Sequence, residues 1–282
     1  MCIICEGKNV NGLKLLDISF CSRVTDIPVI VGLKRLYCHG CPFLRSIPVI
    51  VGLEILSCSD CPNITLIPNI MGLKKLCCYN LKLVEIYNIV GLKKLTCVEC
   101  NITHIPNIIG LEYLNCRDSS IKEIPNITGL KELICSGCVN LKEIPNITGL
   151  EDLNCSWCEI TTVPDIPGLV YLECMNCKNI KEISNVGLRN LNCSRCSLIT
   201  KIPEVQTLDC SNCPWLIQSL ENKVKLGLKL QSWIRKNFRY FVFKKWIGSV
   251  EGKDFFYDPD NIGGRVEKVK IRKVFENEKF YI

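Results

Sequence analysis

Histidine is scarce in this 282-residue sequence, which contains only His39 and His104. Both lie inside a repeated phrase, and no nucleophile–base pair stands out around them. The sequence therefore predicts a noncatalytic protein that needs no cofactor.

Long apolar runs are also missing. No stretch of about 20 apolar residues is present, so no transmembrane helix is expected. Residues 1–6 contain no basic region followed by an apolar run, so no signal peptide is expected either. Disulfide bonds persist mainly in oxidising compartments. We therefore expect a cytoplasmic protein whose 22 cysteines stay reduced.

Cysteine is absent after Cys213, and the charge balance changes at the same place. Residues 214–282 contain 15 Lys and Arg against 8 Asp and Glu, whereas residues 1–213 contain 20 of each. This composition divides the chain into residues 1–213 and a basic tail, 214–282. The neutral first part lacks the basic surface that nucleic acid requires, so nucleic-acid binding there is not expected.

A repeat fills the first part of the chain. Gly-Leu occurs ten times between Gly12 and Leu188, at intervals of 19 or 20 residues. Most copies continue as Leu-x-x-Leu-x-Cys-x-x-Cys, with Ile18, Leu81 and Ser119 as the departures, and most end in Ile-Pro-x-Ile-x-Gly, as in 144–149. A period near 20 residues indicates a solenoid, in which each unit buries its apolar face against its neighbours.

The spacing within each unit predicts one short strand. The second leucine and the first cysteine, as in Leu36 and Cys38, are two residues apart and point to the same face of a strand. Repetition would stack about eleven parallel strands at roughly 4.8 Å intervals. Proline in eight of ten return segments disfavours a helix there and favours extended backbone. The last unit is three residues shorter between Pro203 and Leu208, so the stack should tighten or end there.

From Leu13 to Cys213 the chain resembles leucine-rich repeat proteins, whose pattern is L-x-x-L-x-L-x-x-N/C-x-L. The resemblance implies an α/β solenoid shaped like a horseshoe, with parallel strands on the concave face, extended segments and turns on the convex side, and a helical C-terminal cap. The short unit is most similar to bacterial-effector repeats, and the doubled cysteines resemble repeat proteins of large DNA viruses of amoebae. Some such effectors carry a ubiquitin-ligase domain with a catalytic cysteine, but residues 214–282 contain no cysteine, so that activity is not implied.

The paired cysteines have two interpretations. Nine Cys-x-x-Cys pairs begin at Cys2, Cys38, Cys58, Cys97, Cys135, Cys155, Cys174, Cys193 and Cys210. Four thiolates make a structural zinc site, but a real site needs particular pairs that are set apart from the rest. We favour a structural ladder without metal, in which the first cysteine replaces an inward leucine and the second partners buried backbone groups. Cys77 falls at an outward strand position, where it is expected to be reactive.

Binding should involve the outward residues of the concave face, which alternate with the core. Aromatic residues, Met and Arg are enriched in protein interfaces. The predicted partner-binding residues are Tyr79, Tyr113, Arg117, Trp157, Tyr171 and Met175. An alternative is that these side chains are simply tolerated on a surface.

The tail contains a basic amphipathic pattern across residues 220–247. A helix there would cap the open end of the solenoid, or it would bind a membrane surface, nucleic acid or a calmodulin-like protein. The residues that would make such tail contacts are Lys225, Lys229, Arg235, Lys236 and Arg239.

These features predict a noncatalytic scaffold that binds a protein partner, from a host or a virus, through its concave strand face. A tether acting through the tail is the main alternative, and a cysteine-rich metal-binding array is a lesser one. No small-molecule substrate is expected.

Overall fold

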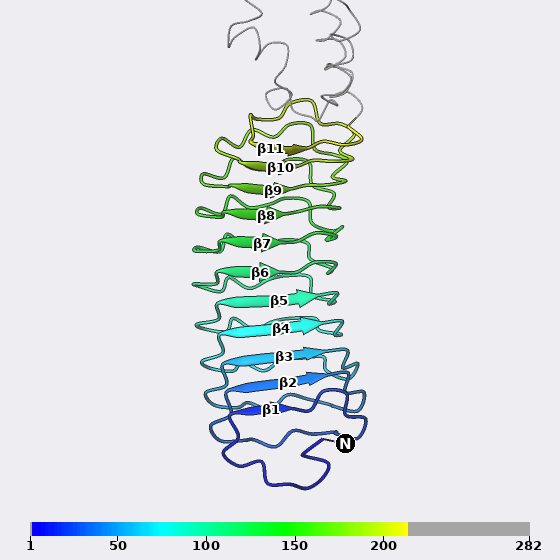
Figure 1. Cartoon of the computed structure of the whole chain (residues 1–282), viewed down its shortest axis with the longest axis vertical. Helices are drawn as coiled ribbons and strands as arrows, with labels where there is room; N and C mark the ends of the chain where they lie inside the picture. The colour runs from blue at the N-terminus through cyan, green and yellow to red at the C-terminus, as the bar shows by residue number, and fades with distance from the viewer. Residues whose placement is uncertain (1, 214–282) are drawn as a thin grey trace, which may run out of the picture.

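The computed structural model describes residues 2–213, which form a single stack of coils with one short strand in each coil (Figure 1). The predicted helical cap and the five basic tail residues lie outside the described residues, so both stay predictions. Within residues 2–213, no helix is long and apolar enough to cross a membrane.

Eleven parallel strands form one sheet in chain order. Their bounds are β1 Leu15–Asp17, β2 Arg35–His39, β3 Ile55–Ser59, β4 Lys75–Tyr79, β5 Lys94–Val98, β6 Tyr113–Asn115, β7 Glu132–Ile134, β8 Asp152–Asn154, β9 Tyr171–Glu173, β10 Asn190–Asn192 and β11 Thr207–Asp209. Equivalent positions pair, so that Leu36 lies beside Leu56 and Cys38 beside Cys58. Each position of the repeat therefore forms a column along the stack, which confirms the predicted solenoid.

The core is one continuous apolar column that runs from Leu16 to Cys213. The second leucine and first cysteine of each strand point into it, as Leu133 and Cys135 do with no exposed surface. The isoleucines of the return segments, such as Ile127, close the other side. No single coil could bury these side chains alone, so each coil depends on its neighbours.

The return segments of the described coils are extended backbone and turns, as the prolines predicted. The glycine before each first leucine has positive φ, for example +91° at Gly129. Residues with a Cβ rarely adopt this conformation, so the turn that starts each unit selects glycine.

Strand length follows from one side chain. In β1, β6, β8, β10 and β11 an Asp or Asn ends the three-residue strand, and its side chain accepts a hydrogen bond from the N–H two residues later. Such local bonds turn the backbone out of the strand. The five-residue strands β2–β5 have Tyr37, Ser57, Cys77 and Thr96 at this position. The short strands β7 and β9 lack the Asx residue but pair with strands that have it.

The two ends of the stack differ from its middle. At the N-terminal end, residues 2–13 form no strand, and Ile3, Ile4 and Val10 pack partly buried against the first coil. At the other end, the shortened return leaves Ile202, Val205 and Leu208 only partly buried. Despite the loss of three residues, β11 still pairs with β10.

Candidate interaction surface and cysteine ladder

The six predicted partner-binding residues all lie on the strand side or at the turn that follows it. Tyr113 and Tyr171 begin β6 and β9, and Tyr79 ends β4. Arg117, Trp157 and Met175 follow β6, β8 and β9. Tyr79, Arg117, Trp157 and Tyr171 are exposed, whereas Tyr113 and Met175 are half-buried.

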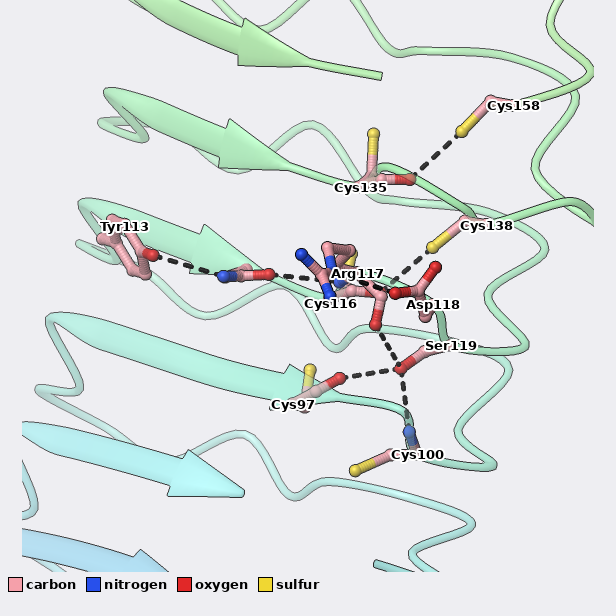
Figure 2. Close-up of polar contacts among 11 residues, drawn as sticks. Cys97, Cys100, Tyr113, Cys116, Arg117, Asp118, Ser119, Cys135, Cys138 and Cys158 are labelled. Atoms are coloured by element: carbon pink, nitrogen blue, oxygen red, sulfur yellow. Dashed lines mark hydrogen bonds and ion pairs between the residues drawn. The ribbon is translucent and has the colours of Figure 1, made fainter. Parts of the chain in front are cut away.

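Polar contacts orient the side chains around β6 (Figure 2). The Asn115 amide donates to the Tyr113 hydroxyl at 3.4 Å and accepts the Arg117 N–H at 3.2 Å. The Arg117 Nε donates to the Asp118 carboxylate at 2.9 Å. Lys94 Nζ lies 5.8 Å from the centre of the Tyr113 ring. These contacts hold the Tyr113 and Arg117 side chains in place, so that less conformational entropy is lost when a partner binds.

Trp157 occupies a turn that every coil repeats directly after its strand. The residue at this position has positive φ in all eleven coils, and its φ is 63° at Trp157. A bulky residue in this region stores about 1–3 kcal/mol of strain. Hydrogen bonds between coils impose the turn, since the Trp157 N–H donates to the Met175 carbonyl at 2.8 Å. The Trp157 side chain is nevertheless 47% exposed, so strain and exposure together mark it as a candidate contact residue.

The register divides the six residues into two groups. Tyr79, Tyr113 and Arg117 belong to coils β4–β6, and the other three belong to coils β8 and β9. Tyr113 and Tyr171 share a column, but Glu132 and Asp152 lie between them, at a separation of about 14 Å for three strand spacings. The six residues thus lie on or next to the strand face, and acidic residues separate the two groups, in the column order that the repeat predicts.

Charge changes sign along the strand face. Arg35, Lys75 and Lys94 lie in one column of β2, β4 and β5, and Glu132 and Asp152 continue that column in β7 and β8. Burial and the neighbouring carboxylates of Glu132 and Glu173 raise the pKa of Asp152. The face therefore has a basic part before β6 and an acidic part after it.

An exposed apolar ridge was missed by the sequence interpretation. It consists of the residues that precede the turn glycine in five successive coils, each 79–84% exposed: Val31, Val51, Met71, Val90 and Ile109. Coils β7 and β8 have Thr128 and Thr148 at this position. The sequence did contain a sign of this ridge, because a residue beside a turn glycine lies at the outside of a coil. However, the ridge residues are apolar and recur with the same period as the core residues, so the two sets look alike in the sequence.

The second cysteine of each unit forms a ladder of hydrogen bonds through the stack (Figure 2). The thiol of Cys138 donates to the Cys116 carbonyl of the preceding coil at 3.1 Å, and Cys158 donates likewise to Cys135. Equivalent bonds of 3.0–3.2 Å are made by Cys41, Cys61, Cys177, Cys196 and Cys213. The predicted ladder is confirmed for these cysteines, whose thiols donate to backbone carbonyls of the preceding coil.

The two departures from cysteine in this column behave differently. Ser119 replaces the thiol function, since its hydroxyl donates to the Cys97 carbonyl at 2.7 Å and accepts the Cys100 N–H at 3.0 Å. Leu81 has no donor and fills the position with apolar volume. The column therefore accepts a hydroxyl in place of the thiol, and in one coil it accepts an apolar side chain.

The thiols of the stack differ in acidity, because hydrogen bonds with a first cysteine of the preceding coil lower the pKa of the ladder thiols Cys138, Cys177 and Cys213, whereas burial raises the pKa of other thiols. Desolvation raises the pKa of Cys41 to about 12 and that of Cys97 well above its ordinary value. Because the thiolate is the reactive form, these cysteines stay inert at neutral pH. Cys77, predicted to be reactive, does lie in an outward column of β4, but it is only 8% exposed. Its neighbours Ser57 and Thr96 flank it on the adjacent strands, so that prediction is not supported.

Three thiols at the N-terminal end lie outside this ladder pattern. The Sγ atoms of Cys2, Cys5 and Cys21 all lie within 4.8 Å of one another. Within residues 2–213, these three cysteines are the one group of His, Cys, Asp or Glu side chains placed closely enough to hold a metal ion.

Comparison with known proteins supports the fold. No protein-family model and no curated protein matches the chain. A solved structure described as the functional domain of InlJ from Listeria monocytogenes, which includes a cysteine ladder, is similar to 71% of this chain, with a TM-score of 0.53 and 22% sequence identity. The match covers 54% of that structure, so this chain corresponds to about half of it. At this identity the likeness establishes the solenoid fold alone, consistent with a leucine-rich-repeat-like architecture.

Proposed function

We propose that this protein is a noncatalytic scaffold whose strand face binds a protein partner. The observation that carries the proposal is Trp157, which is held in a strained turn and left exposed next to Met175, while Tyr171 is exposed at the start of the adjacent strand β9. Leucine-rich repeat proteins generally mediate protein interactions, and the solenoid resembles them. A rigid stack presents its contacts with little loss of entropy on binding.

The charges on the face define the kind of partner. A complementary surface would place acidic groups over Arg35, Lys75 and Lys94, and basic groups over Glu132, Asp152 and Glu173. Aromatic and methionine side chains at β8 and β9 would supply the buried centre of the contact. Complementary charges then set the orientation of the partner and its association rate.

We propose a reducing, cytoplasmic location, because the cysteines are free thiols and the ladder depends on their S–H groups as donors. The viral resemblance of the doubled cysteines remains a prediction, and the partner is proposed to be a host or viral protein. A tether acting through the basic tail remains the alternative function.

The test is affinity capture followed by measurement of the dissociation constant for the captured protein, using the full chain throughout. A face variant carries alanine at Tyr113, Arg117, Trp157 and Tyr171. We expect it to bind at least about 30-fold more weakly, since one hot-spot residue contributes about 2 kcal/mol or more.

Two matched variants separate the other surfaces. A ridge variant replaces the five ridge residues with Thr, which coils β7 and β8 have at this position, and a tail variant replaces the five basic tail residues with Gln. Both should bind like the wild type. Loss of binding in either one, with the face variant unchanged, would transfer the function to that surface.

A further inference from the structure

At the N-terminal end of the stack, the cysteine in the ladder column contacts other thiols instead of a backbone carbonyl of the preceding coil. Cys21 occupies the ladder column of the first coil, where later cysteines donate to the carbonyl of the coil before. Within residues 2–213 no coil precedes this one, and the Cys21 side chain instead meets residues 2–5. The Cys21 Sγ lies 3.5 Å from that of Cys5, which is 3.6 Å from that of Cys2.

The spacing of these three sulfur atoms fits coordination to one ion. Two thiolates bound to the same tetrahedral zinc, each about 2.3 Å from it, lie roughly 3.8 Å apart. The Cys2–Cys5 and Cys5–Cys21 sulfur separations are both close to that value, and the three Sγ atoms all lie within 4.8 Å of one another. Cys38, Cys58 and Cys78 inside the core lie in a line on three successive strands, with Cys58 and Cys78 3.7 Å apart, and so do not surround one point.

A tight turn places both thiols of the Cys2–Cys5 pair on the same side. The Glu6 N–H donates to the Cys2 carbonyl at 3.1 Å, and the Gly7 N–H donates to the Ile4 carbonyl at 3.0 Å. Gly7, with φ of +64°, lets the chain leave the turn. The pair is thus oriented by backbone geometry before any ion arrives.

Access separates this cluster from the ladder. Cys2 and Cys5 are half-buried, so an ion from solvent can reach them and a water molecule can complete four ligands. Ladder thiols such as Cys138 and Cys177 are fully buried, and their S–H groups are committed to carbonyls. Cys2 and Cys5 therefore differ from the other cysteine pairs in the way that a metal site requires, and they lie at the N-terminal end of the stack.

We propose that Cys2, Cys5 and Cys21 bind one zinc ion, which fastens the N-terminal segment onto the first coil. Binding forms three Zn–S bonds and releases three thiol protons to solvent, with no change of oxidation state. The ion would cross-link residues 2–13, which contain no strand, to β1 and so close the end of the core. A solenoid end requires such a cap.

The test measures zinc in the reduced full-length chain, prepared without a histidine tag and freed of loosely held metal by gel filtration. We expect one zinc per chain by mass spectrometry, with three sulfur ligands at about 2.3 Å by X-ray absorption. Titration with cobalt(II) should give thiolate-to-cobalt charge-transfer absorption that saturates at one equivalent. Zinc content well below one per chain, with no such absorption, would overturn the proposal.

Matched serine variants locate the site. Cys5→Ser and Cys21→Ser should lose the zinc, whereas Cys41→Ser, the next cysteine of the same column, should keep it, because Ser119 shows that serine is accepted there. Circular dichroism confirms that each variant is folded. Zinc that survives in Cys5→Ser and Cys21→Ser, or that is lost equally in Cys41→Ser, would disprove the assignment, and the cobalt titration of the wild type decides independently of any variant.

Discussion

At the scale of single residues, the stack depends on how each turn satisfies its backbone. The carbonyl of the first cysteine in a unit leaves the sheet and is met by a side chain of the next coil, as Cys97 is met by Ser119. An unsatisfied buried carbonyl costs about 1–3 kcal/mol, so the Ser119 hydroxyl stabilises this coil. Cysteine suits this position because its remaining surface is apolar.

Ser119→Ala should therefore lower the free energy of unfolding by about 1–3 kcal/mol, because the substitution removes two buried hydrogen bonds. Ser119→Cys restores the residue found in most coils and should change the stability by less than about 1 kcal/mol. Urea denaturation followed by circular dichroism measures both. Equal losses in the two variants would show that packing, rather than the hydrogen bond, governs this column.

A second residue-scale prediction concerns charge between coils. The Glu54 carboxylate lies 2.9 Å from Lys34 Nζ and 2.9 Å from Lys74 Nζ, and hydrogen bonds from these lysines lower the pKa of Glu54 to about 2. A lowered pKa in the folded state means that the stabilisation is present above about pH 4.5 and is lost as the pH falls towards 2.

Carbon-detected NMR titration should find the Glu54 midpoint near 2, and Lys74→Gln should raise it while Lys34 still holds it below 4.5. Glu54→Gln should reduce stability at neutral pH and match the wild type near pH 2. A Glu54 midpoint that Lys74→Gln leaves unchanged would show that the pair is broken by solvent, as many surface ion pairs are.

At the scale of elements, each coil is a strand between two turns with positive φ. The turn before the strand has glycine, whereas the turn after it tolerates Asp, Asn and even Trp157. Gly40 and Gly137 are exceptions in the second turn because neighbouring side chains occupy the space of a Cβ: the Phe20 ring would lie 2.9 Å from a Cβ at Gly40.

Gly129→Ala tests the first turn. A Cβ at Gly129 would contact nothing within 4 Å, but the φ of +91° makes the substitution costly, by about 1–2 kcal/mol of unfolding free energy. Thr128→Ala, one residue earlier and exposed, should change stability by less than about 0.5 kcal/mol. Thermal and urea unfolding of the pair measure the difference, and a neutral Gly129→Ala would mean that this turn relaxes without strain.

At the scale of the molecule, every strand contacts only the strands of the adjacent coils. Stability is therefore a sum of coil and interface terms, and damage in the middle affects two interfaces. The weak point on the described chain is the last coil, where the shortened return exposes part of the core.

Leu133→Ala, in the middle of the stack, should cost about 2–5 kcal/mol because its side chain is completely buried. Leu208→Ala should cost clearly less, since Leu208 is only partly buried. Hydrogen exchange by mass spectrometry should show lost protection in β6–β8 for the first variant and near β11 alone for the second. Uniform loss along the whole array in both would show that the stack unfolds as one unit.

The repeat spacing by itself determined the architecture: the positions of strands, the inward Leu and Cys columns and the extended returns. These features follow from local periodicity and from turn residues, which act over a few positions of the chain. The sequence also favoured a ladder over a metal array, and the hydrogen bonds of Cys138 and Cys158 bear this out.

Only the tertiary structure decided what the columns bring together. It buried Cys77 between its neighbours and exposed the ridge from Val31 to Ile109. It also brought Cys21 to Cys2 and Cys5, although the sequence shows only one more Cys-x-x-Cys pair among nine. These outcomes depend on contacts between coils and at the end of the stack. A pattern that repeats along the chain does not show which side chains meet at these places.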